Sequence, residues 1–187
     1  MEFWVVPVSK GLARQVLQFR RKVYDEASPT IRYTFKKEPP SLESVMKDMK
    51  TSKNRPVAIL ALHDGEVIGE AFADTYKEIL DIAWAVAEEA RGSGVIYALA
   101  YALSDRLIKI NVREVTAFVL ESNKRSIRFL ERVGARRVEK SVVLPPDERW
   151  GKRRRLLTYI VRTEDMMLAA ANGMGRHNID IEAVYGK

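Results

Sequence analysis

The chain has 187 residues, of which 47% are hydrophobic and 30% are charged, as is typical of one globular domain with a sizeable core. The absence of cysteine excludes disulfides and thiol chemistry, and two histidines argue against a histidine-based metal site. A net charge of +7 favours anionic partners, although solubility alone also accounts for it. No apolar run approaches the roughly 18 residues that cross a bilayer, and no secretory signal is recognised. We therefore expect a cytoplasmic protein with no membrane partner and no metal.

The first part of the chain predicts a strand, two helices and a hairpin. After a strand at 3–8, apolar residues spaced three and four apart from Leu12 to Val23 indicate an amphipathic helix. Ser41 is suited to be the N-cap of a second helix of about three turns. The sequence HDGE between two apolar runs then predicts a β-hairpin with a tight turn.

The middle of the chain alternates strands and helices. An apolar run at 78–86 predicts a central strand that is buried on both faces. A helix up to about residue 109 and a strand at 114–120 follow. The next helix is expected between Asn123, as its N-cap, and Gly134, which stops it.

Two further strands, RRVEKSVVL and RRLLTYIVR, complete a domain over residues 1–162. The order β-α-α-β-β-β-α-β-α-β-β predicts a mixed α/β fold. Residues 163–187 form a C-terminal appendage, in which we expect a helix ending at Gly173 and a short strand at 179–185. This appendage either covers the core or pairs two chains into a homodimer.

The strand at 78–86 leads through the sequence ARGSGV directly into a helix. Glycines let the backbone approach a ligand closely, and the first free amides of a helix attract a phosphate. Arg91 adds a full positive charge, so the stretch predicts a phosphate site at residues 91–96. It also fits a plain glycine-assisted turn, because Gly-x-Gly alone is a weak signal and neither the dinucleotide fingerprint nor the P-loop is complete here.

Two motifs together resemble those of the GCN5-related N-acetyltransferase (GNAT) superfamily. The acyl-CoA motif of this family, Arg/Gln-x-x-Gly-x-Gly/Ala, corresponds to residues 91–96, with Ile96 in place of the last small residue. The second motif corresponds to Asn123, Ser126, Phe129 and Gly134. The resemblance covers roughly residues 3–162. It implies a mixed, mostly antiparallel sheet flanked by helices, and transfer of an acetyl group from acetyl-CoA to a primary amine of a protein or small molecule by direct attack.

The resemblance also implies which residues hold acetyl-CoA. The pantetheine arm would lie between the strands at 78–86 and 114–120, and the pyrophosphate would lie at the glycine turn. The expected cofactor-binding residues are Ala85, Val86, Ala87, Arg91, Gly92, Ser93, Gly94, Val95, Ile96, Asn123 and Ser126. Lys124, Arg125 and Arg128 either meet the nucleotide phosphates or form a solvated basic face.

The general base of the family has no direct counterpart in this sequence, because its usual positions align near Leu80 and Phe118. Asp81 is our first candidate for a replacement, since a carboxylate within an apolar strand needs a partner or a task. Glu78 is the second, and Glu121 is a further candidate. The alternative for each is an ordinary carboxylate at a strand edge or in an ion pair.

The general acid is also altered, because Leu130 stands where many relatives carry a tyrosine. Tyr97 is the candidate that we favour, and Tyr101 and Tyr159 are the others. Each of these tyrosines also fits a packing role.

These departures leave open a second hypothesis, a catalytically weak or inactive protein of the same fold that binds nucleic acid or a protein. In either case the basic loop at 149–155, where Trp150 is followed by a lysine and three arginines, favours an acidic or nucleic-acid partner. The same loop also fits a charged hairpin that resists edge pairing.

Overall fold

The computed structural model describes residues 1–26, 40–49, 56–76, 78–144 and 154–184. The strands are β1 (Trp4–Pro7), β2 (Val57–His63), β3 (Glu66–Tyr76), β4 (Ile79–Val86), β5 (Glu114–Leu120), β6 (Arg136–Leu144) and β7 (Arg154–Arg162). The helices are α1 (Ala13–Glu26), α3 (Leu42–Asp48), α4 (Val95–Lys109), α5 (Lys124–Arg132), α6 (Thr163–Arg176) and α7 (Ile181–Val184). Single 3-10 turns lie at Lys10–Leu12 and Glu88–Ala90.

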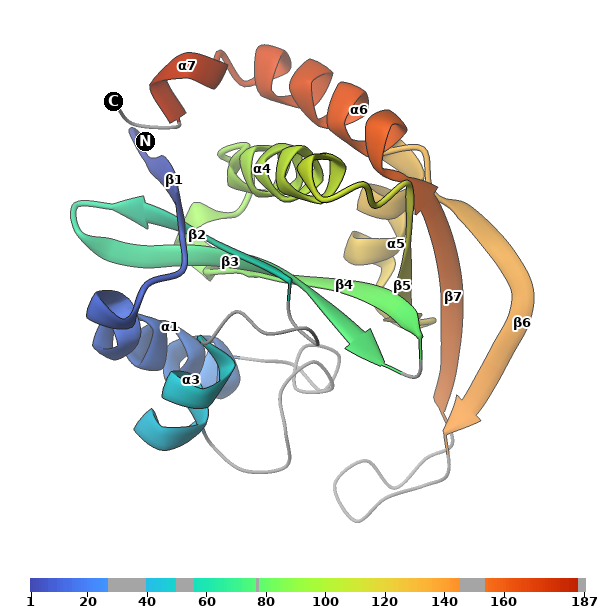
Figure 1. The fold of residues 1–187 in the computed structure, drawn as a ribbon, viewed down its shortest axis with the longest axis horizontal. Coiled ribbons are helices and arrows are strands. Elements are labelled where there is room, and N and C mark those ends of the chain that lie inside the picture. The colour runs from blue at the N-terminus through green and yellow to red at the C-terminus, as the bar shows by residue number, and fades with distance from the viewer. Residues whose placement is uncertain (27–39, 50–55, 77, 145–153, 185–187) are drawn as a thin grey trace.

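The strands form one sheet in the order β1-β2-β3-β4-β5-β7-β6, which Figure 1 shows from the side. All neighbouring strands are antiparallel except β4 and β5, which run parallel and are connected through α4. The predicted mixed, mostly antiparallel sheet flanked by helices is therefore confirmed.

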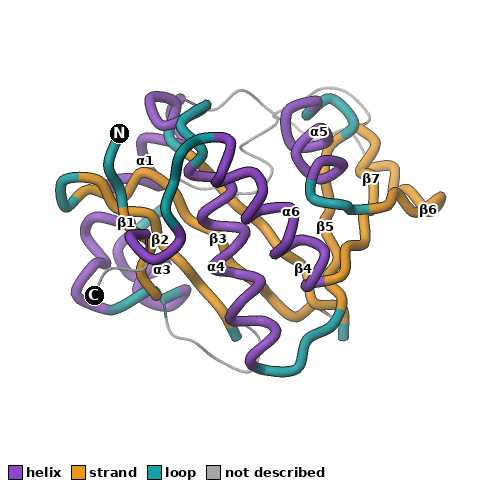
Figure 2. Tube along the Cα trace, turned by 90° about the horizontal axis from the view of Figure 1, so that it is seen from above, coloured by secondary structure: helices purple, strands orange, loops and turns teal. Residues whose placement is uncertain are grey.

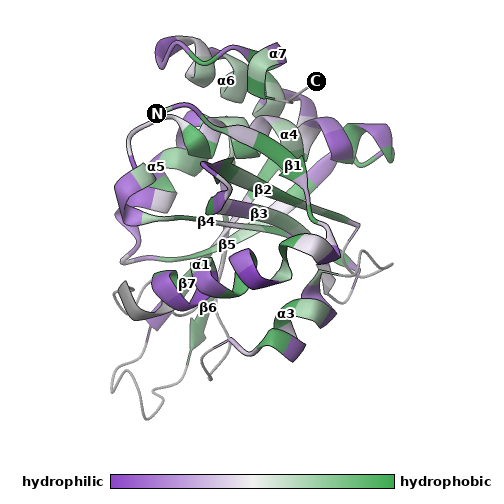
Figure 3. Cartoon of the chain, turned by 90° about the vertical axis from the view of Figure 1, so that its left-hand side faces the viewer, coloured by the Kyte–Doolittle hydropathy of each residue, from purple (hydrophilic) through white to green (hydrophobic). Residues whose placement is uncertain are grey.

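Helices cover both faces of the sheet. On one face, α1 and α3 pack against each other, and the apolar side of α1 meets β3. On the other face, α4 lies against β2 and β3, and α6 forms an outer layer on α4 (Figures 1 and 2). Colouring by hydropathy shows mostly hydrophobic strands between these layers, with hydrophilic stretches on α1 and α5 (Figure 3). None of the described helices is long and apolar enough to span a bilayer.

Two local predictions agree with the structure. Ser41 is the N-cap of α3 and accepts a hydrogen bond from the amide of Ser44, whose hydroxyl accepts from the amide of Ser41 in return. The hairpin between β2 and β3 turns at Asp64 and Gly65, both with positive φ angles (49° and 80°). Such a turn matches the right-handed twist of the two strands that it joins.

A buried ion cluster ties α1 and α3 to the sheet. The Arg20 side chain donates from Nε to both carboxylate oxygens of Glu70 at 3.1 Å, and from a terminal nitrogen to Asp48 at 2.8 Å. Arg20 and Glu70 are 8% and 3% exposed. Because a guanidinium and two carboxylates neutralise and hydrogen-bond one another, these charges are tolerated in the interior.

The C-terminal segment differs from the prediction in two ways. The helix does not end at Gly173 but continues as α6 to Arg176, and residues 181–184 form a short helix, α7, where we expected part of a strand. Packing overrides the low helix propensity of glycine, because Gly173 lies against the ring of Tyr97 on α4. Met166 and Met174 of α6 are fully buried in the main core. The appendage therefore covers the core, and pairing into a homodimer stays a prediction.

The prediction for β4 was only partly right. The strand begins at Ile79 rather than at Glu78, which lies in the preceding turn with a φ of 68°. Only Ile82 and Ala85 are fully buried in β4, so the strand is not covered on both faces along its length. Trp84 and Val86, near the end of the strand, are only partly buried because they line an open cleft.

The two glycines near the end of α6 provide a matched test of this packing. A Cβ atom at Gly173 would overlap the Tyr97 ring, whereas one at Gly175 would have no neighbour within 4 Å in the described part of the chain. We expect Gly173→Ala to lower the free energy of unfolding by about 1–3 kcal/mol through overpacking. We expect Gly175→Ala to raise it by about 0.5–1 kcal/mol, since alanine favours a helix. Urea unfolding of both variants checks this, and equal effects would contradict the observed contact.

Candidate functional site

The sheet opens between β4 and β5. Among the described residues, these two strands are paired at Asp81 and Thr116 alone, whereas β4 pairs with β3 from Ile79 to Val86. Beyond Asp81 the edge of β4 that faces β5 has no strand partner, so its backbone groups are available to a ligand. The last three residues of β4, Trp84 to Val86, line a cleft of about 620 Å³.

The glycine turn lies at the end of β4 and opens α4. Gly92 and Gly94 have φ angles of 85° and 90°, which side chains rarely adopt, and Gly94 is the N-cap of α4. Among the described residues, the amides of Gly94, Val95 and Ile96 donate to no backbone carbonyl. Free amides at the positive end of a helix suit an anion.

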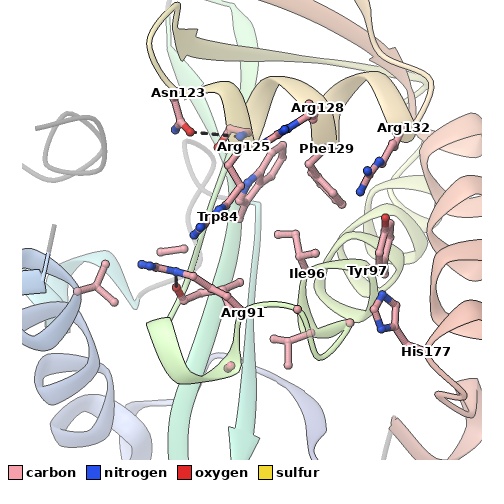
Figure 4. Close-up of a pocket in the computed structure, with 18 residues that line it drawn as sticks. Trp84, Arg91, Ile96, Tyr97, Asn123, Arg125, Arg128, Phe129, Arg132 and His177 are labelled. Carbon is pink, nitrogen blue, oxygen red and sulfur yellow. Dashed lines mark hydrogen bonds between the residues drawn. The ribbon is translucent and has the colours of Figure 1, made fainter. Parts of the chain in front are cut away.

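Helix α5 forms the opposite side of the cleft. Its N-cap Asn123 accepts a hydrogen bond at 3.2 Å from the amide of Ser126. Arg125, Arg128 and Arg132 follow at helical spacing and line the cleft, as Figure 4 shows.

The charged side chains that line the cleft are arginines, so its charge is positive. Arg91 joins the three arginines of α5, and no aspartate or glutamate is found among the described residues that line the cleft. Arg91 donates from Nε to the carbonyl oxygen of Val86 at 3.3 Å and lies 3.4 Å from a carboxylate oxygen of Glu88. The arrangement therefore favours a ligand with several negative charges.

Aromatic rings form the apolar wall of the cleft. Trp84 meets Phe129 edge to face, with ring centroids 5.0 Å apart, and Tyr97 lies 5.5 Å from Phe129. Ile96 lies in the first turn of α4 and also lines the cleft (Figure 4). An apolar wall beside a cationic rim suits a ligand with an uncharged arm and a charged head.

The structure brings most of the expected cofactor-binding residues together. Those that line the cleft are Ala85, Val86, Arg91, Gly92, Gly94, Val95, Ile96, Asn123 and Ser126. Ala87 and Ser93 are not among them. The amide of Ala87 donates to Ile68 of β3, and the hydroxyl of Ser93 donates to the carbonyl of Ala90 at 2.7 Å. Of the three basic candidates on α5, Arg125 and Arg128 line the cleft and Lys124 does not.

Asp81 lies on the other face of the sheet from Trp84. It shares its face with Ala85, which packs in the cluster under α1 and α3. Burial raises the pKa of Asp81 to about 7, hydrogen bonds from the backbone of Phe118 and Ile82 oppose this, and the nearby Asp74 adds to it. Its Oδ1 atom is buried and has no hydrogen-bond partner among the described residues. A carboxylate that has a pKa near 7, and one oxygen without a hydrogen-bond partner among the described residues, is suited to accept a proton.

The other catalytic candidates are arranged less favourably. Glu78 is exposed in the turn before β4, and Glu121 lies 3.8 Å from Arg155 in an ion pair. Tyr97 lines the cleft, but its ring packs between Phe129 and His177. Leu130, at the position of the family's tyrosine, is 1% exposed in the core.

Tyr159 is buried on β7 and donates to Glu131 at 3.4 Å. Burial and the negative charge of Glu131 raise the pKa of its hydroxyl.

Sequence reasoning missed five residues that line the cleft, namely Val23, Trp84, Ala90, Arg132 and His177. Arg132 follows Arg125 and Arg128 at helical spacing, a signal that was present in the sequence. His177 had none, because it follows α6 and reaches the cleft only through packing. In the basic loop at 149–155, residues 149–153 lie outside the described part of the chain.

Solved structures with the same fold are numerous. An N-acetyltransferase from Staphylococcus aureus Mu50 matches with a TM-score of 0.73 at 13% identity, over 87% of this chain and 99% of that one. An acetyltransferase from Salmonella typhimurium, solved with its cofactor acetyl-CoA, matches with a TM-score of 0.73 at 12% identity, over 87% and 95%. A GNAT superfamily phosphinothricin acetyltransferase from Sinorhizobium meliloti, in complex with acetyl-CoA, matches with a TM-score of 0.70 at 18% identity, over 87% and 89%.

A comparison with curated protein sequences finds no match. The model of the acetyltransferase (GNAT) family, however, matches residues 20–135, from the middle of α1 to the end of α5. This span is more than half of the chain and includes the divergent strands, the glycine turn and Asn123. The chain therefore belongs to the GNAT family of acetyltransferases.

Proposed function

We propose that the protein is an N-acetyltransferase that transfers an acetyl group from acetyl-CoA to a primary amine of a protein or small molecule. The observation that carries this proposal is the cationic cleft that opens where β4 and β5 diverge. Acetyl-CoA combines an uncharged pantetheine arm with a strongly anionic nucleotide, which is the combination that the cleft suits. Membership of the GNAT family supports the same donor.

The described residues fit acetyl-CoA at each part of the cleft. The edge of β4 that faces β5 is available beyond Asp81 to the amide groups of the pantetheine arm, and the amides of Gly94 to Ile96 are available to the pyrophosphate. Arg125, Arg128 and Arg132 supply positive charge for the remaining phosphate. Ile96 lines the cleft where the family carries a glycine or alanine, but among the described residues its amide donates to no backbone carbonyl.

Acetyl-CoA supplies an activated thioester, and the protein orients it and manages the protons. The thioester enters from the side of α4 and α5, and the amine enters from the side of α1 and α3. In this arrangement Asp81 lies on the amine side, at the point where the strands part. As the amine nitrogen bonds to the acetyl carbon, Asp81 would accept the proton that the nitrogen releases. The C–S bond of the thioester would then break, and the CoA thiolate would leave and take up a proton from solvent. A backbone amide of β4 near Val86 stabilises the negative charge that develops on the carbonyl oxygen.

The second candidate is a weakly catalytic member of the family that binds a nucleic acid or protein. Leu130 in place of the usual tyrosine is the observation that favours it, since a buried leucine protonates no leaving thiolate. Measured release of CoA separates the two, because this candidate binds acetyl-CoA without turning it over on any amine.

Acetyl-CoA binding is tested with a matched pair of glycines. Gly92 and Gly65 have φ angles of 85° and 80°, and a Cβ at either would meet no atom of the described residues within 4 Å. Only Gly92 lines the cleft. We expect Gly92→Asp to weaken acetyl-CoA binding by at least about tenfold, because its carboxylate repels the phosphates. Gly65→Asp carries a similar backbone cost of about 1 kcal/mol and leaves the affinity unchanged. Calorimetric titration of each variant with acetyl-CoA measures the two affinities. An unchanged affinity of Gly92→Asp would refute the placement of the phosphates at the glycine turn.

The role of Asp81 is tested by its pH–rate profile. We expect kcat/KM to rise with pH and level off above about 7, as Asp81 ionises. Asp81→Asn should lower kcat by roughly 10²–10⁴-fold, the usual contribution of a general base. Asp74→Asn removes a negative charge that raises the pKa of Asp81, so it should shift the inflection to lower pH. Asp105→Asn, on α4, is the control. A full rate in Asp81→Asn would exclude this base.

The raised pKa of Asp81 also makes the free energy of unfolding depend on pH. Its pKa rises from 3.8 to about 7 on folding, so the folded state holds the proton more tightly than the unfolded state. The free energy of unfolding therefore falls as the pH rises from about 4 to 7, because over this range the carboxyl group is ionised in the unfolded state and still protonated in the folded state. Asp81→Asn stays uncharged, so its free energy of unfolding should exceed that of the wild type by up to about 4 kcal/mol at pH 8. At pH 4 the two should nearly coincide. Urea titrations at both values check this, and a variant that is less stable at pH 8 contradicts it.

A further inference from the structure

The end of α6 lies directly against the glycine turn. A Cβ atom at Gly94 would clash with the side chain of Ile179, and it would lie 2.9 Å from Cβ of His177. Gly94 is therefore required for two reasons, its positive φ and the close approach of the segment that follows α6. One turn earlier, Gly173 lies against the Tyr97 ring. The segment that follows α6 is thus fixed to the start of α4, at the amides that face the cleft.

This contact places the His177 ring at the mouth of the cleft. His177 is exposed and lines the cleft together with Tyr97 and Gly94. Its ring lies 5.7 Å from the Tyr97 ring, and Figure 4 shows it on the side of Tyr97 away from Arg132. Among the described residues, no hydrogen bond or ion pair engages its ring. The imidazole is therefore free to meet a ligand.

The surroundings of His177 favour an anion. The guanidinium of Arg176 lies 5.9 Å from the centre of the Tyr97 ring, and Arg132 faces the same part of the cleft (Figure 4). In the part of the chain that the structure describes, the amides of Gly94, Val95 and Ile96 donate to no backbone carbonyl there. An imidazole N–H beside unpaired amides and arginines is a suitable donor to a phosphate oxygen, in either protonation state of the ring.

We propose that His177 donates a hydrogen bond to the pyrophosphate of the bound acyl-CoA, so that the segment after α6 completes the cofactor site. His177 lies outside the span that the family model matches, residues 20–135. The inference rests on the proposed function, since it needs acyl-CoA in the cleft. It assigns a binding role to a residue in the part of the chain whose role the sequence left open.

The test compares CoA with 3′-dephospho-CoA, which keeps the pyrophosphate. We expect His177→Ala to weaken the binding of both ligands by roughly tenfold, the usual effect of losing one hydrogen bond to a charged group. His177→Gln keeps an N–H donor and should recover part of the affinity. His63→Ala is the control, because His63 is the other histidine of the chain and lies at the β2–β3 hairpin. Thermal unfolding without ligand should change little in all three variants, since both rings are partly or fully exposed.

The outcomes separate this inference from the proposed function. Equal losses for the two ligands in His177→Ala, with His63→Ala unchanged, support the assignment. Unchanged affinity in His177→Ala, or a loss confined to CoA, overturns it and leaves acyl-CoA binding intact. If the wild-type protein binds neither ligand, the proposed function fails, and the role of His177 fails with it.

Discussion

The divergence of β4 and β5 is the constraint on which the rest of the site depends. A sheet that opens leaves backbone donors and acceptors without partners, and these must be satisfied by water or by a ligand. Among the described residues the two strands are paired at Asp81 and Thr116 alone, so the opening begins after the third residue of β4. Trp84 and Phe129 cover its apolar side, and arginines surround its outer end. The divergence of the two strands therefore creates the cleft, and the side chains around it determine which kind of ligand it suits.

The two parts of the proposed site are built in different ways. At the glycine turn, Gly92 and Gly94 have positive φ angles, and among the described residues the amides of Gly94, Val95 and Ile96 donate to no backbone carbonyl. The proposed base, Asp81, lies on the face of the sheet under α1 and α3, and its pKa is raised mainly by burial. The proposed phosphate site thus depends on backbone conformation, whereas the proposed base depends on the burial of one side chain.

Features that depend on a few neighbouring residues could be predicted from the sequence. The glycine turn, the Ser41 cap and the hairpin at Asp64 are each defined by a few neighbouring residues, and all three agree with the structure. Two motifs and the order of elements were sufficient for the family. Residues brought together only by packing were not predictable. His177 reaches the cleft because α6 packs on α4, and Gly173 stays helical because a tyrosine ring lies against it. No local pattern encodes either contact.

The contact between β1 and α7 has a consequence for how the chain folds. Val184 of α7 and Val5 of β1 are both buried in the main core, and the two elements touch. Contacts between residues so far apart in sequence close a long loop, and they form late because the loop entropy must first be offset. β1 is also an edge strand of the sheet, which is prone to pair with other chains while it is uncovered. β1 is thus protected fully only after α7, near the other end of the described residues, has formed and docked.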